Sequence, residues 1–217
     1  MISQSYAIFA FNVLATQLKK QKVQLPLSKF TAIDPDTESG LDVTKKYPLF
    51  VTWNIFDERY NDYILRGCIG TFSAKKPLEK EIESYALTAA FNDHRFNPIT
   101  LKELPRLECG ITILSNFEEA KDAMDWELGT HGIILSLPYH GQQLSATFLP
   151  DVAVEQEWTK EETLIQLAGK AGAPIKDVSK IVESATLTRY QGSKTKASYS
   201  DYEDTLKLVQ KTDSQSE

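Results

Sequence analysis

The chain has 217 residues, the length of one large domain or of two small units that share a core. Its hydrophobic fraction of 41% and charged fraction of 25% are those of an ordinary globular protein and exclude collagen-like, coiled-coil and wholly disordered classes. A net charge of -6 disfavours non-specific nucleic-acid binding, because such binding needs a positive surface.

The cysteines and the N-terminal residues indicate in which cellular compartment the protein is found. Cys68 and Cys109 cannot build a disulfide framework, and the sequence contains no Asn-x-Ser/Thr acceptor. In the partly apolar stretch 6–18 the lysines follow the apolar run, whereas a signal peptide places positive charge before it. No window approaches the roughly 20 apolar residues of a membrane span. We therefore expect a cytoplasmic and nuclear protein without a membrane segment.

The N-terminal third predicts a helix, a loop and two strands. Apolar residues recur at helical spacing over 6–18, so we expect an amphipathic helix that caps the core. Turn-forming residues at 33–40 predict a surface loop. The segments 48–55 and 63–72 are rich in β-branched and aromatic residues and predict strands, joined by a polar loop at 57–59.

The middle of the chain changes to helical periodicity. Pro77 suits a first helical turn, and apolar residues over 78–89 have helical spacing, so a helix is predicted there. A further strand is predicted over 107–114. Asn116 is followed three residues later by Glu119, the arrangement of a cap and its reciprocal partner. A short helix is therefore predicted from Asn116 to about Met124.

The next segments predict a hairpin and a helix. Strands over 133–137 and 144–148 flank Pro-Tyr-His-Gly at 138–141, which is typical of a hairpin turn. A helix is predicted over 163–171, ended by Gly172.

These elements predict an α+β domain with a mainly antiparallel sheet flanked by helices. The strand pairs within 48–72 and 133–148 have connections too short for a crossover helix. We expect a single domain over 1–211, with a smaller subdomain drawn from about 25–60 and C-terminal segments. Residues 212–217 contain no apolar side chain and are predicted to be a disordered tail.

The most unusual string is Leu-Arg-Gly-Cys-Ile-Gly at 65–70. Glycines weaken a strand interior, so Gly67 and Gly70 mark a bulge or a close approach of the backbone. In a regular strand Arg66 and Cys68 share one face with Gly70, and a cation beside sulfur favours the nucleophilic thiolate. The alternative is that Cys68 is small filling in the core, since cysteine is among the most buried residue types.

The three histidines are the candidate bases for Cys68. His131 lies in Gly-Thr-His-Gly just before a strand, where a hydrogen-bonded turn residue is the alternative interpretation. His94 is better explained as a residue at the end of a helix, and His140 as a solvated turn residue. Cys109 has no local charge partner. No pair of histidines has metal-ligand spacing, so neither a zinc site nor a cofactor is predicted.

Two charged residues, Asp93 and Arg95, lie in the loop after the predicted helix at 78–89. An ion pair or cap accounts for Asp93 and Arg95, and such a pair at a surface contributes under about 1 kcal/mol. The functional alternative is that Arg66 and Arg95 converge on an anionic group, because arginine binds carboxylates and phosphates bidentately. The glycines form neither GxGxxG nor a Walker loop, so no nucleotide site is predicted.

At these residues the chain resembles a eukaryotic member of the AMMECR-one (AMMECR1) family. The hexapeptide at 65–70 is similar to the signature of that family. The likeness covers about residues 5 to 200 and includes Ala89-Ala90-Phe91, Asp93, Arg95-Phe96, Pro98, Glu103-Leu104, His131-Gly132, Phe148 to Ala153, Trp158 and Lys170-Ala171-Gly172.

The resemblance implies a fold but no established reaction. It implies an α+β fold of a larger and a smaller subdomain, and a nuclear or cytoplasmic location. The association of some prokaryotic members with Memo-like and radical SAM proteins points towards enzymology. His94 is not expected to be fixed as histidine in the family. The insert-like stretch 34–40 and the hydrophilic region 191–204 depart from the compact prokaryotic pattern, and we expect them to be peripheral additions.

Two functions from different classes remain open. The first is an enzyme in which Cys68 is the nucleophile and His131 the base, acting on an unknown anionic small molecule. That substrate would be bound by Arg66, Gly67, Gly70, Asp93 and Arg95. The second is a non-catalytic interaction module, in which the hexapeptide is structural and surface loops bind a protein partner. A third, weaker alternative, a nucleic-acid factor, rests only on the basic run 189–196.

Overall fold

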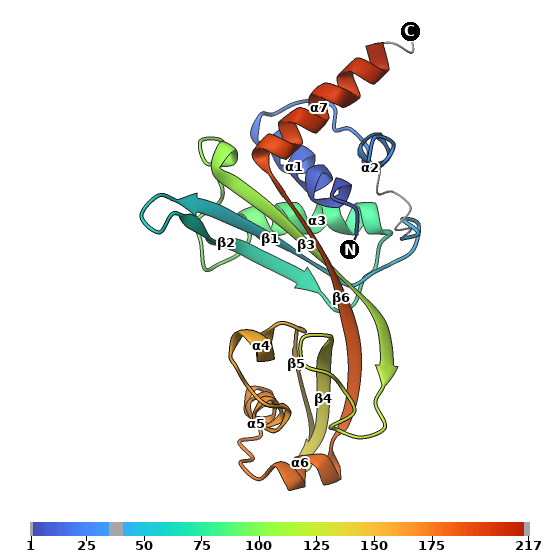
Figure 1. The fold of residues 1–217 in the computed structure, drawn as a ribbon, viewed down its shortest axis with the longest axis vertical. Helices are drawn as coiled ribbons and strands as arrows, with labels where there is room; N and C mark the ends of the chain where they lie inside the picture. The colour runs from blue at the N-terminus through green and yellow to red at the C-terminus, as the bar shows by residue number, and fades with distance from the viewer. Residues whose placement is uncertain (1, 35–40, 215–217) are drawn as a thin grey trace. The chain divides into compact units, whose positions relative to one another are not determined.

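Figure 1 shows a computed structural model of the chain, in which residues 2–34 and 41–214 are described. The fold is α+β, as the sequence predicts. The chain divides into two compact units: the first runs to Ile113 and resumes at Ser193, and the second is Leu114–Gly192. Residues 25–60, expected in a smaller subdomain, belong instead to the first unit. Within the described ranges no helix is long and apolar enough to cross a membrane.

Six strands form one sheet in the order β2-β1-β3-β6-β4-β5. Neighbouring strands pair antiparallel where β1 meets β2 and β3, and where β4 meets β5 and β6. The strands are β1 (Leu49–Asp57), β2 (Asp62–Thr71), β3 (Leu107–Glu119), β4 (His131–Tyr139), β5 (Gln142–Phe148) and β6 (Thr186–Ser198). The strands predicted at 48–55, 63–72, 107–114, 133–137 and 144–148 are therefore confirmed, with shifted ends.

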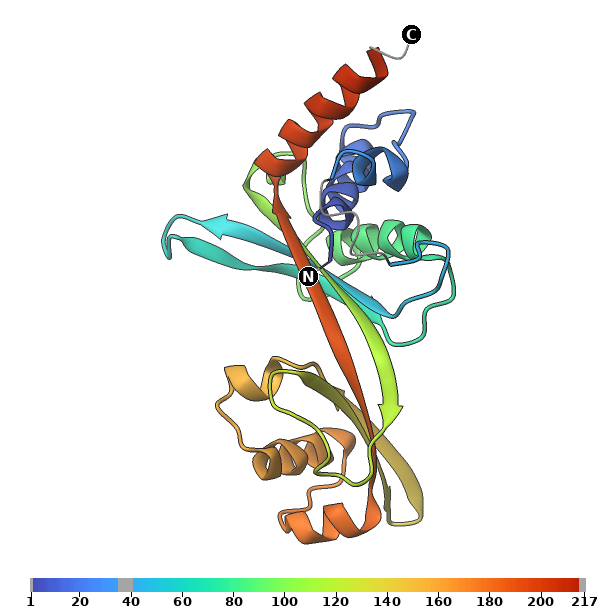
Figure 2. The ribbon, with the colours of Figure 1, turned by 45° about the vertical axis from the view of Figure 1, so that its right-hand side comes forward.

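The first unit is built around a buried helix. Its helices are α1 (Ser5–Leu18), α2 (Leu27–Thr31), α3 (Leu78–Phe91) and α7 (Tyr199–Ser214). Every residue of α1 from Ser5 to Thr16 is buried. The prediction of an amphipathic cap is wrong because α1 contacts α2, α3 and α7, as Figures 1 and 2 show, so that it has no solvent-facing side.

One face of the sheet in the first unit packs against these helices. Trp53 is buried, lies 5.0 Å from Phe11 of α1 between ring centroids, and donates its indole N–H to the Ala86 carbonyl of α3. Side chains alternate along a strand, so Thr52 and Asn54 project from the opposite face. That opposite face carries the polar residues described below.

The second unit contains α4 (Val152–Glu155), α5 (Lys160–Ala171) and α6 (Val178–Ser184); α5 packs against β4, β5 and α6, and α6 packs against β4. The helix at 163–171 is confirmed and ends at Gly172, whose φ of 96° is left-handed. The hairpin is also confirmed, with His140 and Gly141 at φ 47° and 76°.

The helix predicted from Asn116 to Met124 is wrong, because β3 continues to Glu119. Asn116 has a positive φ of 53°, and its amide donates to the Gln191 side chain of β6. Phe117 stacks on the buried ring of Tyr190, also in β6, at 5.0 Å. Partners distant in sequence therefore hold this segment extended, and a local capping pattern does not report them.

The C-terminal region also differs from its prediction. The region 191–204 is not a peripheral addition, because β6 lies between β3 and β4 in the sheet and α7 follows it directly. In the predicted disordered tail, residues 212–214 are helical, and 215–217 lie outside the described residues. Of the predicted surface loop 33–40, residues 35–40 also lie outside them.

Candidate functional site

Cys68 lies on β2, directly opposite Thr52 of β1. The Thr52 hydroxyl donates a hydrogen bond to the Cys68 sulfur at 3.2 Å. Cys68 is half-buried, on the sheet face opposite to Trp53 and the helices. The thiol is therefore not core filling.

A bulge at Arg66 changes the face of the sheet to which side chains of the hexapeptide point. Trp53 pairs with Gly67, but the next residue, Asn54, pairs with Leu65, so Arg66 is an extra residue on β2. The alternation that puts Arg66 and Cys68 on one face requires a regular strand. The prediction that Arg66 and Cys68 share one face is therefore wrong, although the bulge itself agrees with the glycine pattern.

The Arg66 guanidinium is held by the segment that follows α3. Its Nε donates to Glu103 at 2.8 Å, and Nη2 donates to the Pro98 carbonyl at 3.4 Å. The side chain is only 13% exposed, and within the described part of the chain its buried Nη1 has no hydrogen-bond partner. Burial raises the pKa of Glu103, but hydrogen bonds from Arg66 and Thr100 outweigh it and leave that pKa below its usual value. Arg66 thus has a structural partner.

Both glycines of the hexapeptide are explained by close packing. A Cβ on Gly67 would lie 2.2 Å from the carbonyl oxygen of Ala89 in α3. A Cβ on Gly70 would lie 2.3 Å from the Leu49 carbonyl oxygen and 2.4 Å from the Phe50 ring. No real Cβ tolerates such distances from backbone atoms, so both positions require glycine without invoking a ligand.

The Asp93 carboxylate joins β2 to the end of α3. Its Oδ2 accepts the backbone N–H of Cys68 at 2.9 Å, and its two oxygens accept Nε and Nη2 of Arg95 at 2.9 and 2.6 Å. The Asp93 side chain is 4% exposed. The hydrogen bond from Arg95, against the effect of burial, holds the pKa of Asp93 well below its usual range. The predicted ion pair is confirmed, and it also anchors Cys68.

Arg95 is the cation that neighbours Cys68. Its Nη2 donates to the Cys68 carbonyl at 3.1 Å, while the side chain remains 57% exposed. The hydrogen bond to Asp93 raises the pKa of Arg95, and the charge of a Cys68 thiolate adds to this. Arg66 and Arg95 do converge, but on the ring of Phe96, at 5.9 and 5.5 Å from its centroid. Of the two arginines, Arg95 and not Arg66 contacts Cys68, through the backbone carbonyl of that residue.

The other candidate groups are placed differently. Cys109 is fully buried, and burial raises the pKa of its thiol well above the usual value. His94 and His140 are exposed. His131 lies in the second unit, where its Nδ1 accepts the backbone N–H of Glu127 at 3.1 Å. Because Nδ1 accepts this bond, a neutral imidazole carries its proton on Nε2. A nitrogen that already carries a proton cannot accept one from a thiol, so Nε2 cannot act as the base in this arrangement.

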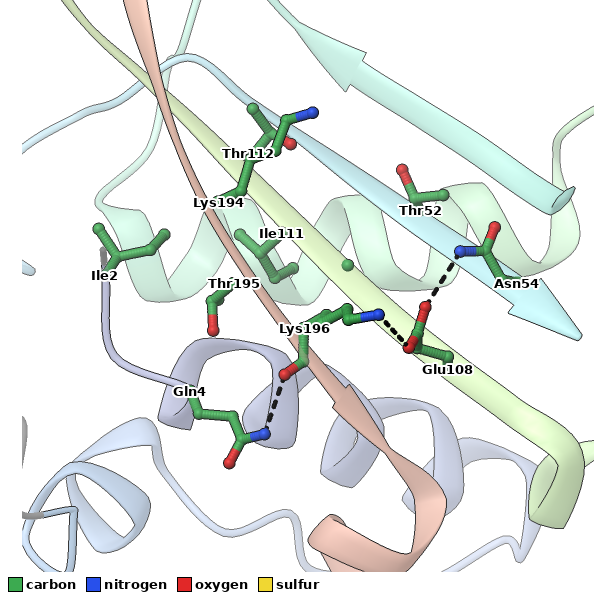
Figure 3. Close-up of a pocket in the computed structure, with 11 residues that line it drawn as sticks. Ile2, Gln4, Thr52, Asn54, Glu108, Ile111, Thr112, Lys194, Thr195 and Lys196 are labelled. Carbon is green, nitrogen blue, oxygen red and sulfur yellow. Dashed lines mark hydrogen bonds and ion pairs between the residues drawn. The ribbon is translucent and has the colours of Figure 1, made fainter. Parts of the chain in front are cut away.

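A pocket of about 630 Å³ lies in the first unit (Figure 3). Glu108 forms an ion pair with Lys196 at 3.0 Å and accepts the amide of Asn54 at 3.4 Å. Thr52, which donates to the Cys68 sulfur, also lines the pocket. Its lining comprises Ile2, Gln4, Thr52, Asn54, Glu108, Gly110, Ile111, Thr112, Lys194, Thr195 and Lys196.

Sequence reasoning missed Thr52 and this pocket. The lining comes from β1, β3, β6 and the N-terminal segment, and only the strand register brings these together. Among the described residues no group of three or more His, Cys, Asp and Glu side chains could hold a metal ion.

Comparisons with known proteins agree with the sequence resemblance. The uncharacterized protein YOR289W of Saccharomyces cerevisiae is 39% identical, over 96% of this chain and 91% of its own length. The uncharacterized protein C688.03c of Schizosaccharomyces pombe is 37% identical, over 96% of this chain and 100% of its own length. The uncharacterized protein At2g38710 of Arabidopsis thaliana is 42% identical, over 72% of this chain and 73% of its own length.

A solved structure shares the fold. The crystal structure of the uncharacterized protein PH0010 from Pyrococcus horikoshii matches with a TM-score of 0.63 and 22% identity, over 90% of this chain and 93% of that one. The AMMECR1 family model matches residues 7–195, which include the hexapeptide, Asp93 and Arg95. The chain therefore belongs to the AMMECR1 family.

Proposed function

We propose that the protein is an enzyme in which the Cys68 thiol attacks a small anionic substrate while Arg95 binds the substrate's negative charge. The observation that carries this proposal is the hydrogen bond from Arg95 to the backbone carbonyl of Cys68, whose thiol is half-buried. The proposal assigns no role to Arg66, Gly67 or Gly70 in binding substrate, because each has a structural explanation within the fold.

The hydrogen bonds of Arg95 support a ligand-binding role. Its bonds to Asp93 and Cys68 use the backbone N–H, Nε and Nη2. In the described part of the chain Nη1 makes no hydrogen bond, and the side chain is 57% exposed. A guanidinium fixed along one edge by a carboxylate presents its remaining donors at a constant position, which suits recognition of a carboxylate or phosphate.

The surroundings of the sulfur support the nucleophile. The Thr52 hydroxyl donates a hydrogen bond to the Cys68 sulfur, which holds the sulfur in one position, and the thiolate is the reactive form of cysteine. Because Cys68 is half-buried, we propose that its proton leaves to solvent before the attack. The sulfur lone pair then forms a bond to the electrophilic atom of the substrate, from which the leaving group departs with its electron pair.

The test compares alkylation of Cys68 by iodoacetate, which is anionic, with alkylation by iodoacetamide, which is neutral and otherwise similar. An isolated cation about 6 Å from a reacting anion contributes about 0.7 kcal/mol in a water-like dielectric, which is about threefold in rate and an upper bound here, because the Asp93 carboxylate offsets part of the charge of Arg95. We therefore expect the iodoacetate-to-iodoacetamide rate ratio at Cys68 to exceed that of a neutral small thiol by a factor of up to about three. Peptide mass spectrometry separates Cys68 from Cys109, whose burial makes it an internal unreactive reference.

Two variants of Arg95 assign the effect. Arg95→Gln removes the positive charge and leaves that of Asp93, so the ratio should fall to that of the small thiol or below it, whereas Arg95→Lys keeps the charge and should retain most of the preference. A ratio in the wild-type protein equal to that of the small thiol, or a preference unchanged in Arg95→Gln, would rule out the proposed role. Circular dichroism of each variant separates this result from unfolding.

A second candidate function is a protein-interaction module. It is favoured by exposed apolar side chains on the hairpin of β1 and β2, where β2 is an edge strand: Tyr60, Tyr63, Ile64 and Leu65. This function predicts that Cys68 shows no charge preference. It also predicts that Ile64→Lys abolishes binding to a partner while leaving the thermal stability of the isolated protein unchanged.

A further inference from the structure

The pocket in the first unit contains a glycine that the fold itself does not require. Gly110 lies inside β3 and lines this pocket of about 630 Å³, a volume within the range of small-molecule sites. A Cβ added to it would lie 3.7 Å from the Cβ and 4.0 Å from the carbonyl oxygen of Thr52, which are ordinary contacts. The φ of Gly110 is not positive either. A larger side chain would therefore fit at this position.

Three other strand glycines are different in this respect. A Cβ on Gly67, Gly70 or Gly132 would lie 2.2, 2.3 and 2.4 Å, respectively, from an atom of another residue, so each of them must be glycine. Glycine weakens the interior of a strand, and it often marks a place where a ligand or another backbone approaches closely. In the described structure the space over Gly110 is part of the pocket, and a ligand would account for the glycine.

Two hydrogen-bonding groups of the lining are held by one carboxylate. Glu108, two residues before Gly110 on β3, accepts the amide of Asn54 on Oε1 at 3.4 Å and pairs with Lys196 through Oε2 at 3.0 Å. Figure 3 shows Asn54 and Lys196 both directed to Glu108. The Glu108 side chain is only 12% exposed, so it is a fixed support. Asn54 and Lys196 are therefore held side by side.

The groups that remain available on these two residues match an amide. In the described part of the chain Oδ1 of Asn54 accepts no hydrogen bond, and the ammonium group of Lys196 has three N–H donors, of which Glu108 takes one. Glu108 neutralises the charge of Lys196, and Lys194, the other charged residue of the lining, points away from that pair in Figure 3. An uncharged group that donates one hydrogen bond and accepts another therefore suits this part of the pocket.

The strand register connects Gly110 to the thiol. Thr52 of β1 pairs with Cys68 of β2 on one side and with Gly110 of β3 on the other, so the three residues belong to the same face of the sheet. Adjacent strands are about 4.8 Å apart, so the Cα atoms of Cys68 and Gly110 are about 10 Å apart. An extended chain of about three residues spans that distance.

We propose that the pocket binds the peptide-like part of a substrate, whose amide lies over Gly110, donates its N–H to Asn54 and accepts a hydrogen bond from Lys196. This inference rests on the proposed function, because it names the chemical class of the substrate of the Cys68 thiol. That substrate is a small acid whose negative group binds Arg95 and which carries a short amide chain.

The first experiment measures binding of N-acetylglycylglycinamide, a neutral amide probe, to the full chain by saturation-transfer difference NMR. We expect saturable binding with a dissociation constant below about 10 mM, weakened about fivefold or more in Gly110→Val. The matched control is Gly169→Val on α5, another glycine whose added Cβ meets no close neighbour, and it should leave binding unchanged.

Gly110→Val also has an expected effect on stability. Because a Cβ fits at this position and valine favours strands, the thermal midpoint of the variant should equal or exceed that of the wild type. A lowered midpoint would show that packing requires the glycine. That result, no saturable binding of the probe, or equal binding in Gly110→Val and Gly169→Val would overturn the proposal.

The second experiment tests the reach to the thiol with two neutral iodoacetamides of similar length. One carries a glycylglycinamide tail, and the other carries a methoxyethoxyethyl tail without a further amide. We expect the amide-to-ether rate ratio at Cys68 to exceed that of a neutral small thiol about threefold or more, and the excess to vanish in Gly110→Val. Lys196→Met should reduce the excess, whereas Lys22→Met, at an exposed lysine outside the lining, should keep it. A ratio equal to that of the small thiol, or an excess unchanged in Gly110→Val, would overturn the reach to Cys68.

The outcomes also distinguish this inference from the proposed function. Absence of probe binding and of the amide preference, together with a preference of Cys68 for iodoacetate, rejects the pocket and retains the thiol. An amide preference that depends on Gly110, without a preference for iodoacetate, retains the pocket and rejects the role of Arg95.

Discussion

Replacing Asp93 with asparagine keeps the shape of the side chain and removes its charge. The two carboxylate oxygens accept four hydrogen bonds: Oδ1 from the backbone N–H and Nε of Arg95, and Oδ2 from Nη2 of Arg95 and the backbone N–H of Cys68. An amide retains one acceptor oxygen and turns a donor towards the other pair. At least two of the four bonds are therefore lost.

The expected cost follows from the burial of the partners. A hydrogen bond to a charged group is worth about 1.5–3 kcal/mol when its partners stay buried, and less when they can return to water. Arg95 is half-exposed and regains water, but the N–H of Cys68 does so less readily. We expect Asp93→Asn to lower the free energy of unfolding by about 2 kcal/mol, measured by urea denaturation followed by circular dichroism.

The pH dependence of this difference has a definite sign. The pKa of Asp93 is lowered in the folded state by its hydrogen bond from Arg95, so its contribution is fully present above the ordinary aspartate pKa of about 4. That contribution is lost as the pH falls below this value towards the lowered pKa. The stability gap between wild type and Asp93→Asn should therefore be full at neutral pH and should narrow in acid.

Asp57→Asn is a matched control. Asp57 and Arg59 form the same pair two residues apart, with Nη2 to Oδ2 at 2.6 Å, but Asp57 accepts no hydrogen bond from the hexapeptide in the described structure. Its replacement should cost clearly less than that of Asp93. An equal loss in the two variants, or a loss at Asp93 below about 0.5 kcal/mol, would refute the reasoning.

Two further predictions concern the hexapeptide and its neighbour. Gly67→Ala should lower the free energy of unfolding by about 2 kcal/mol or more, because its Cβ would meet the Ala89 carbonyl oxygen at 2.2 Å. Gly169 lies within α5, and a Cβ added to it would meet no atom within 4 Å, so Gly169→Ala should raise the free energy of unfolding by about 0.5–1 kcal/mol. Thermal melts in which Gly67→Ala is not less stable than Gly169→Ala would contradict the packing at Gly67. Thr52→Val should slow iodoacetamide labelling of Cys68 severalfold, because the sulfur loses its hydroxyl donor. Thr112→Val, which changes a threonine on the same face of the sheet, is the control, and equal labelling rates in the two variants would count against a role of the Thr52 hydrogen bond.

Local sequence signals predicted the elements whose ends are set by neighbouring residues. The helix at 163–171 has a capping box between Thr159 and Glu162 and a left-handed Gly172, all close in sequence. The hairpin turn at His140 and Gly141 likewise depends on its own backbone. The fold class follows from such elements, and the family likeness agrees with it.

Long-range pairing explains what the sequence could not predict. β6 has few apolar residues, and only Leu187, Tyr190 and Ala197 of it are buried apolar side chains, so its pattern does not indicate a central strand. Its place is instead fixed by pairing with β4.

The candidate site was predictable in part. The glycine pattern indicated a bulge, and the proximity of Asp93 to Arg95 indicated an ion pair, both of which the structure contains. The position of the bulge at Arg66 could not be read from one strand alone, because it is defined by the register with β1. That register moves Arg66 to Glu103 and leaves Arg95 as the cation beside Cys68.

The salt dependence of Cys68 labelling tests most directly whether the charge of Arg95 acts on the thiol. Screening shortens from about 30 Å at 0.01 M salt to about 3 Å at 1 M, so a preference caused by a nearby exposed cation must weaken over this range. We predict that the iodoacetate-to-iodoacetamide rate ratio at Cys68 exceeds that of a neutral small thiol at 0.01 M and falls towards it at 1 M. A ratio that matches the small thiol at every salt concentration would contradict the account.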